Sequence, residues 1–167
     1  MLSRRVVPLV LLALSFGRRP VTGQTPLQPP PIIPYGLPIT IENAKLAGAA
    51  AVAEAHSHGW AMAIAIVDPA GLLVYFETMT DTQNASVELS MEKARTSALF
   101  RRPTRVFQDA LAAGGDNLRV LGLTGAMPNA GGIPIVVNGK LIGAIGVSGG
   151  SVDQDAQVAQ SGVAAVK

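Results

Sequence analysis

The sequence predicts an α/β (α+β) domain in which helices pack on a mainly antiparallel central sheet of about five strands. Two pairs of apolar, β-compatible runs are each joined by a short turn, which predicts two antiparallel hairpins. Apolar residues at helical spacing precede, separate and follow these hairpins. Two hairpins separated by helices cannot form the repeated crossovers of a doubly wound sheet, so the prediction is an antiparallel sheet covered by helices.

The composition is that of one globular domain without cysteine chemistry. The chain has 167 residues, of which 49% are apolar and 14% charged, and it contains no Cys. This length provides for one hydrophobic core. The absence of Cys excludes a disulfide framework, a thiolate nucleophile and a Cys-ligated metal site.

The first 23 residues have the pattern of a cleaved export signal. Four arginines and no acidic residue flank a mainly apolar run, Val6–Phe16, and small residues follow near residue 23. Arg4 and Arg5 also resemble a twin-arginine signal, so both this route and the general secretory route stay open. We expect a periplasmic or secreted protein without a membrane span after cleavage. The remaining residues carry 9 basic and 11 acidic side chains, which argues against a nucleic-acid partner.

A proline-rich stretch, residues 24–38, separates this signal from the domain and predicts an extended tether. A single domain is expected over residues 39–167. It begins with a helix from Ile41, capped by Thr40 and ended by Gly59. The first hairpin consists of strands at 60–67 and 72–77 around an Asp-Pro-Ala-Gly turn.

The second half of the domain is predicted as three helices and three strands. Ser86 and Thr104 are expected to cap helices that reach Phe100 and Ala113. A capping box of Ser151 and Gln154 begins the last helix, which reaches residue 165. The strands are expected at 118–123, 133–137 and 141–147, the last two joined by an Asn-Gly turn.

Imidazole and thioether groups are the soft ligands that this chain offers. His56 and His58 lie two positions apart near a helix end, so they point to different sides and cannot grip one metal together. The helix dipole also favours a histidine there without any ligand role. Met79 and Met127 lie in predicted loops and are candidate haem ligands together with the histidines, although a loop methionine is also ordinary packing.

Lys93 and nearby carboxylates are the candidates for acid-base chemistry. Apolar periodicity on the helix at 86–100 favours a solvated position for Lys93, with an inward position over a pocket as the alternative. Glu88 and Glu92 most simply form a hydrated network with Arg95.

The segment Gly146–Gly150 matches G-x-S-x-G between a strand and a helix. A nucleophile elbow needs a histidine after the serine, and both histidines precede it, so we interpret the segment as a glycine turn before a capped helix.

Many ordered segments together resemble the GlcG/HbpS family of haem-binding-like proteins. The resemblance covers residue 39 to the C-terminus. It is carried by the stretches 67–72, 76–79, 82–83, 86–88, 93–98, 100–104, 131–134, 143–150, 154–155 and 158–159.

The resemblance implies a profilin-like domain that forms homo-oligomers with pockets at subunit boundaries. It implies haem as cofactor and a pocket formed by Met79, Lys93, Asp155 and the loop Gly131, Gly132, Ile133 and Pro134. If these residues form one site, Met79, Lys93 and Ile133 should converge on one cavity. Relatives commonly carry Met-Asp after the first hairpin, often with a basic residue before the Met, whereas this chain has Thr78-Met79-Thr80-Asp81.

Two main functions follow as expectations, and a purely interacting accessory subunit whose glycine-rich loops serve assembly alone is a third. The first is an exported haem- or tetrapyrrole-binding protein without turnover, acting in storage, protection or accessory sensing with a membrane sensor kinase. The second is a cofactor-independent lyase or isomerase that uses Lys93 with Asp81, Glu88 or Asp155. An inward Lys93 beside a carboxylate would favour the enzyme, and a slot edged by Met79, Met127 or a histidine would favour haem.

Overall fold

The computed structural model describes residues 32–167, which fold as a four-stranded sheet covered by helices. The predicted export signal and residues 24–31 of the predicted tether lie outside these residues. No helix in the described part is long and apolar enough to cross a membrane. The elements are α1 (Ile41–Ser57), β1 (Ala63–Val67), β2 (Leu73–Thr78), α2 (Ala85–Phe100), α3 (Arg105–Ala113), the 3₁₀-helix η1 (Gly115–Gly122), β3 (Gly132–Val137), β4 (Lys140–Ser148) and α4 (Val152–Ala164).

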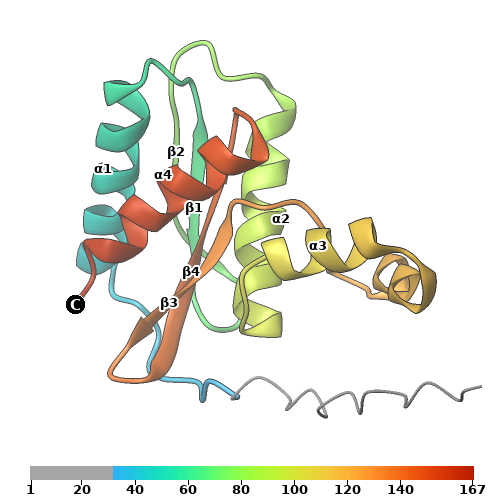
Figure 1. The fold of residues 1–167 in the computed structure, drawn as a ribbon. Coiled ribbons are helices and arrows are strands. Elements are labelled where there is room, and N and C mark those ends of the chain that lie inside the picture. The colour runs from blue at the N-terminus through green and yellow to red at the C-terminus, as the bar shows by residue number, and fades with distance from the viewer. Residues whose placement is uncertain (1–31) are drawn as a thin grey trace, which may run out of the picture. The chain divides into compact units, whose positions relative to one another are not determined.

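The sheet has the order β2-β1-β4-β3, and every neighbouring pair is antiparallel. Helices α1 and α4 pack together on one face, and α2 covers the other (Figure 1). The mixed α/β class and both predicted hairpins are therefore confirmed. The finer, profilin-like arrangement stays a prediction.

The predicted strand at 118–123 is wrong, so the described sheet has four strands and not five. This stretch lies within the 3₁₀-helix η1 and the residue that follows it. Gly114 and Gly115 take positive φ values of 65° and 59°, which turns the chain into tight 3₁₀ turns. Only Val120 of η1 is buried, and this stretch pairs with no strand of the described sheet. Helix α3 and η1 form an arm that stands out from the sheet (Figure 1).

Two of the four predicted helix caps are confirmed. The Thr40 hydroxyl accepts a hydrogen bond from the Asn43 N–H, and the capping box of Ser151 and Gln154 is complete. Ser86 is not a cap, because α2 begins at Ala85 and Ser86 is buried in the first turn. Thr104 occupies the cap position of α3 without capping it. Its hydroxyl instead accepts a 2.9 Å hydrogen bond from the Gly132 N–H.

Residues 34–38 of the predicted tether, together with Ile39, lie beside β4. The Leu141 N–H donates to the Pro34 carbonyl at 2.9 Å, and the Gly36 and Ile39 N–H groups donate to β4 carbonyls at 2.7 Å. The pairing between β1 and β4 ends at Val67 and Ala144. This segment therefore satisfies the backbone groups of β4 beyond the point where β1 ends.

The two faces of the sheet carry side chains of different size. Toward α1 and α4 the core contains isoleucine and valine, including Ile64, Ile66 and Ile145. Toward α2 it contains mainly alanine and valine, namely Ala65, Val67, Ala94, Ala98 and Ala144. Small side chains on both partners let the α2 backbone approach the sheet closely.

Two glycines mark the closest approach between α2 and the sheet. A Cβ placed on Gly146 would lie 2.0 Å from the Ser90 carbonyl oxygen, and one on Gly132 would lie 2.3 Å from the Lys93 carbonyl oxygen. Real Cβ atoms do not reach such distances, so only glycine fits at either position. The α2 backbone rests directly on β4 and β3 at these two points.

The preference for a solvated Lys93 is wrong, because Lys93 is 1% exposed. The buried face of α2 includes Ser86, Ser90, Lys93 and Ser97, which follow helical spacing one position away from the apolar residues used for the prediction. Because several residues on the buried face are polar, the apolar residues alone did not identify the face of α2 that is buried. The Lys93 Nζ donates to the Asp155 carboxylate at 2.7 Å and to the Val147 carbonyl at 3.0 Å.

This pair fastens the beginning of α4 to α2. Besides the Lys93 ammonium, the Asp155 carboxylate accepts a 3.0 Å hydrogen bond from the Gly150 N–H. Burial raises the pKa of Asp155, against the opposing effect of the hydrogen bond from Lys93. The hydrogen bonds from Lys93 and Gly150 favour the ionised carboxylate and so oppose the effect of burial.

We expect Gly146→Ala to destabilise the domain by at least about 3 kcal/mol, because the added methyl would overlap backbone atoms of α2. The matched control is Gly122→Ala, where an added Cβ meets nothing within 4 Å. We expect the control to stay within about 1 kcal/mol of the parent in urea unfolding. Equal losses in the two variants would contradict the close approach.

Lys93→Met should cost about 3–5 kcal/mol, because it leaves the Asp155 carboxylate buried without its cation. Lys93→Met combined with Asp155→Asn should recover a large part of that loss, since the amide oxygen still accepts from Gly150. Because the pKa of Asp155 is already raised and removal of Lys93 raises it further, the single variant should lose less stability near about pH 5 than near about pH 8. Urea unfolding at both pH values checks this, and a loss independent of pH would contradict it.

Candidate functional site

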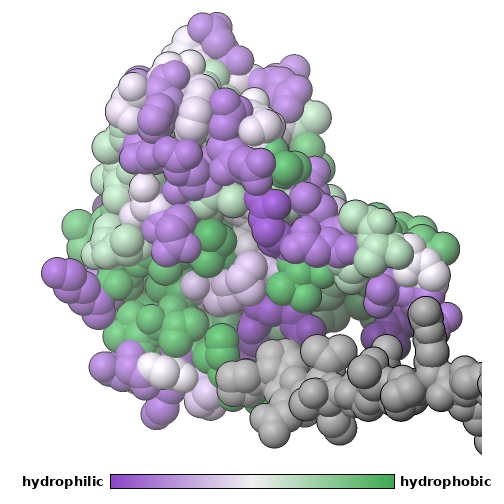
Figure 2. Space-filling view, in the orientation of Figure 1, coloured by the Kyte–Doolittle hydropathy of each residue, from purple (hydrophilic) through white to green (hydrophobic). Residues whose placement is uncertain are grey.

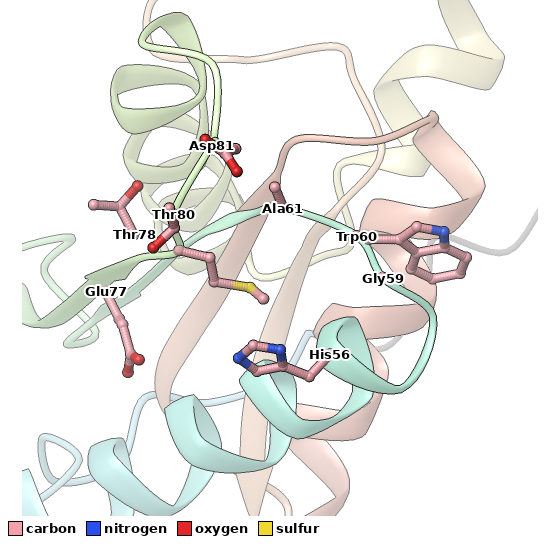
Figure 3. Close-up of a pocket in the computed structure, with 9 residues that line it drawn as sticks. His56, Gly59, Trp60, Ala61, Glu77, Thr78, Thr80 and Asp81 are labelled. Carbon is pink, nitrogen blue, oxygen red and sulfur yellow. The ribbon is translucent and has the colours of Figure 1, made fainter.

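A cleft of about 500 Å³ lies where the end of α1, the residues before β1 and the loop after β2 meet (Figure 3). Pairing between β1 and β2 brings these segments together, with Ala63 opposite Thr78. The Met79 N–H extends this pairing by donating to the Met62 carbonyl at 3.0 Å. The lining residues are His56, Gly59, Trp60, Ala61, Glu77, Thr78, Met79, Thr80 and Asp81.

The cleft brings together two of the candidate haem ligands, His56 and Met79. His56 projects from the last turn of α1 into the space before the loop that carries Thr78 and Thr80 (Figure 3). An imidazole nitrogen and a thioether sulfur are both established axial ligands of haem iron. The cleft therefore provides a donor set that fits haem iron.

His58 and Met127 do not line this cleft. The His58 ring stacks on Trp60 with ring centroids 4.3 Å apart, and its Nε2 lies 3.2 Å from a Glu54 carboxylate oxygen. Met127 is half-buried in the loop after η1, where its N–H donates to the Thr96 hydroxyl at 2.9 Å.

The residues that line the cleft include two carboxylates, Glu77 and Asp81. The Glu77 carboxylate accepts a 2.5 Å hydrogen bond from the Tyr75 hydroxyl. This hydrogen bond, together with burial and the negative charge of Glu77, raises the pKa of Tyr75, so the proton stays on the phenol. Asp81 lies on the loop after β2 with a φ of 67°.

The residues that the resemblance places in one pocket form separate groups here. Met79 lines the cleft, whereas Lys93 and Ile133 do not. Lys93 and Asp155 are buried together beneath Gly131, where an added Cβ would lie 3.1 Å from the lysine Nζ. Gly132 and Pro134 are buried in β3, and Ile133 packs against the main core. The expected convergence of Met79, Lys93 and Ile133 on one cavity does not occur.

The carboxylates named for an enzyme are also dispersed. Asp81 lines the cleft, and Glu88 lines a second cavity of about 150 Å³ between α2 and the turn after β1. Glu92 and Arg95 form an exposed pair with an N–O distance of 3.9 Å. Ser148 of the G-x-S-x-G match is 3% exposed and lies 3.4 Å from the Ser86 hydroxyl, so it is no exposed nucleophile. Within residues 32–167 no group of three or more His, Asp or Glu side chains is placed to hold a metal ion.

Trp60 and Glu77 line the cleft but were treated in the sequence only as part of strands. The hairpin itself contained the information that could have identified them. Residues that precede one strand of an antiparallel pair lie beside those that end the other, so 60–62 must lie beside 77–79. Only the packing of α1 against this hairpin, which brings in His56, was not readable from the spacing.

Comparison with known proteins supports the resemblance. The model of a family described as "Haem degrading protein HbpS-like" matches residues 39–164. Protein GlcG of Escherichia coli is 38% identical over 102 residues, which cover 60% of this chain and 73% of that protein. An uncharacterised 15.0 kDa protein encoded in the dhaT-dhaS intergenic region of Citrobacter freundii is 33% identical over 125 residues, covering 74% of this chain and 88% of its own length.

Two solved structures share the fold at a similar level. A double mutant of HbpS from Streptomyces reticuli is 26% identical with a TM-score of 0.73, covering 90% of this chain and 98% of that one. A complex of PduOC with haem is 28% identical with a TM-score of 0.71, covering 78% and 96%. With a family model that matches most of the sequence and structural neighbours of the same fold, the chain belongs to the HbpS-like family.

Proposed function

We propose that this protein binds haem or a related tetrapyrrole without turnover, in storage, protection or accessory sensing. The observation that carries the proposal is the cleft that His56 and Met79 line together. The family and the haem complex of PduOC support the ligand class. Met79 and His56 are the proposed axial ligands, with His58 and Met127 as the alternatives outside the cleft.

The alternative function is that of a small-molecule lyase or isomerase. An inward Lys93 beside the Asp155 carboxylate favours it, because a buried lysine is a common base or nucleophile. Against it, Lys93 already donates to Asp155 and Val147 and is 1% exposed. A substrate would have to open this pair before it could reach the ammonium group.

We also propose that the protein is exported to the periplasm or secreted. The basic residues, apolar run and small residues of the first 23 positions support this. An extracytoplasmic haem-binding domain would suit an accessory role beside a membrane sensor kinase.

A homo-oligomer is the proposed assembly, and the arm of α3 and η1 is the proposed contact with a second copy. Leu118, Leu121 and Leu123 are exposed on this arm, with Leu121 at 69% exposure, and apolar side chains are visible there in Figure 2. Asp116 and Arg119 are also exposed on η1. Two arms related by a twofold axis could therefore pair these opposite charges around the leucines.

The proposed ligation predicts saturable binding of ferric haem with one equivalent per chain. The variants His56→Ala and Met79→Ala should each change the visible absorption spectrum and weaken binding by at least about 10-fold, the loss expected for one axial ligand. Titration of the chain from Gln24, followed by its absorption spectrum, measures both.

Met127→Ala is the matched control, because Met127 does not line the cleft, and it should leave the spectrum and the affinity unchanged. His58→Ala tests the alternative ligand, since the His58 ring stacks on Trp60 of the cleft. Weak, unsaturable binding that none of the four substitutions affects would overturn the haem proposal and favour the enzyme.

Leu121→Asp should dissociate the proposed oligomer, because it places a charge in the leucine patch. Asp116→Arg alone should weaken assembly, and Asp116→Arg with Arg119→Asp should restore it, since the exchanged charges again face each other. Light scattering of the purified chain measures the mass. A monomeric parent, or a parent mass that Leu121→Asp leaves unchanged, would contradict the arm contact.

A further inference from the structure

The cleft is lined by acidic side chains, whereas a site for an anionic ligand usually contains basic ones. Its nine lining residues include the carboxylates Glu77 and Asp81 but no Lys or Arg. Haem carries two propionates on one edge of its ring, while the opposite edge is uncharged and the iron centre is cationic. A propionate placed near either carboxylate would face a like charge.

The Glu77 carboxylate is fixed in place by contacts that begin in α1. A Cβ on Gly48 would lie 2.4 Å from a ring carbon of Tyr75, so the missing side chain lets the phenol ring lie against α1. From there the Tyr75 hydroxyl donates to Glu77 at 2.5 Å. The hydrogen bond holds the Glu77 carboxylate among the residues that line the cleft.

Asp81 is held at the rim by its backbone. Its φ of 67° lies in the left-handed region, which Asp and Asn adopt more readily than most other residues. The loop Thr78-Met79-Thr80-Asp81 thereby places one carboxylate two residues beyond the proposed sulfur ligand. The second carboxylate, Glu77, precedes the same ligand by two residues, at the end of β2.

We infer that Glu77 and Asp81 select how the ligand enters, so that the cleft accepts a tetrapyrrole by its uncharged edge and keeps both propionates in solvent. This inference rests on the proposed haem function and identifies two specificity residues within it. The ligand class it defines is a planar tetrapyrrole whose carboxylates, if any, lie on a single edge. Tetrapyrroles with carboxylates all around the ring would be excluded.

The test compares ferric haem with its dimethyl ester, in which both propionates are neutral, in the same dilute non-ionic detergent. Glu77→Gln keeps the acceptor for Tyr75, and Asp81→Asn keeps a residue that tolerates the left-handed backbone. Each substitution should tighten the binding of haem by about 2–5-fold, the scale of one screened charge interaction. Neither should tighten the binding of the ester.

Glu88→Gln is the matched control, because it removes the same charge on α2 at the other cavity. It should leave both affinities unchanged. Raising the ionic strength should tighten the binding of haem to the parent more than the binding of the ester. This difference should be smaller in the double variant Glu77→Gln, Asp81→Asn.

Two outcomes separate the inference from the function on which it rests. If neither haem nor the ester binds saturably, the proposed function fails. If haem binds in a manner that depends on His56 or Met79, but the two carboxylate variants match Glu88→Gln, the ligand site stands and the charge selection is overturned.

Discussion

The structure depends on the direct contact between the α2 backbone and the sheet. Side chains ordinarily fill the space between a helix and the sheet that it covers. Here Gly132 and Gly146 remove that layer, so α2 carbonyl groups approach β3 and β4 closely. At these two points the approach leaves no room for bulky side chains, in keeping with the alanine-rich core on this side and the buried serine and threonine residues of α2.

Close packing also accounts for the buried ion pair. A helix face of alanine and serine removes less apolar area from water than one of leucine, so this side of the domain gains less from the hydrophobic effect. The Lys93 and Asp155 pair adds a specific link between α2, the end of β4 and the start of α4. A pair of this kind favours one arrangement of these elements over others, because any displacement would leave a charge unpaired in the core.

The sequence predicted what local chemistry determines and missed what the tertiary contact decides. The Asn138-Gly139 turn, the Ser151 capping box and the first hairpin were readable because turns and caps depend on neighbouring residues. Lys93 was misplaced because the tight contact makes serine a core residue, which hides the buried face of α2 from an apolar pattern. The strand at 118–123 failed because a strand needs a partner edge that no local pattern reports.

The candidate site was predictable only in part, for the same reason. Met79 and His56 were recognised by their chemistry, yet their meeting depends on α1 packing over the first hairpin. The residues implied by the resemblance divide between an open cleft and a closed core, and the two places suit different chemistry. The Lys93 ammonium is buried and already donates to Asp155 and Val147, whereas His56 and Met79 line an open cleft. Because a ligand must reach its site, the open cleft is a stronger basis for ligand binding than the closed pair at Lys93.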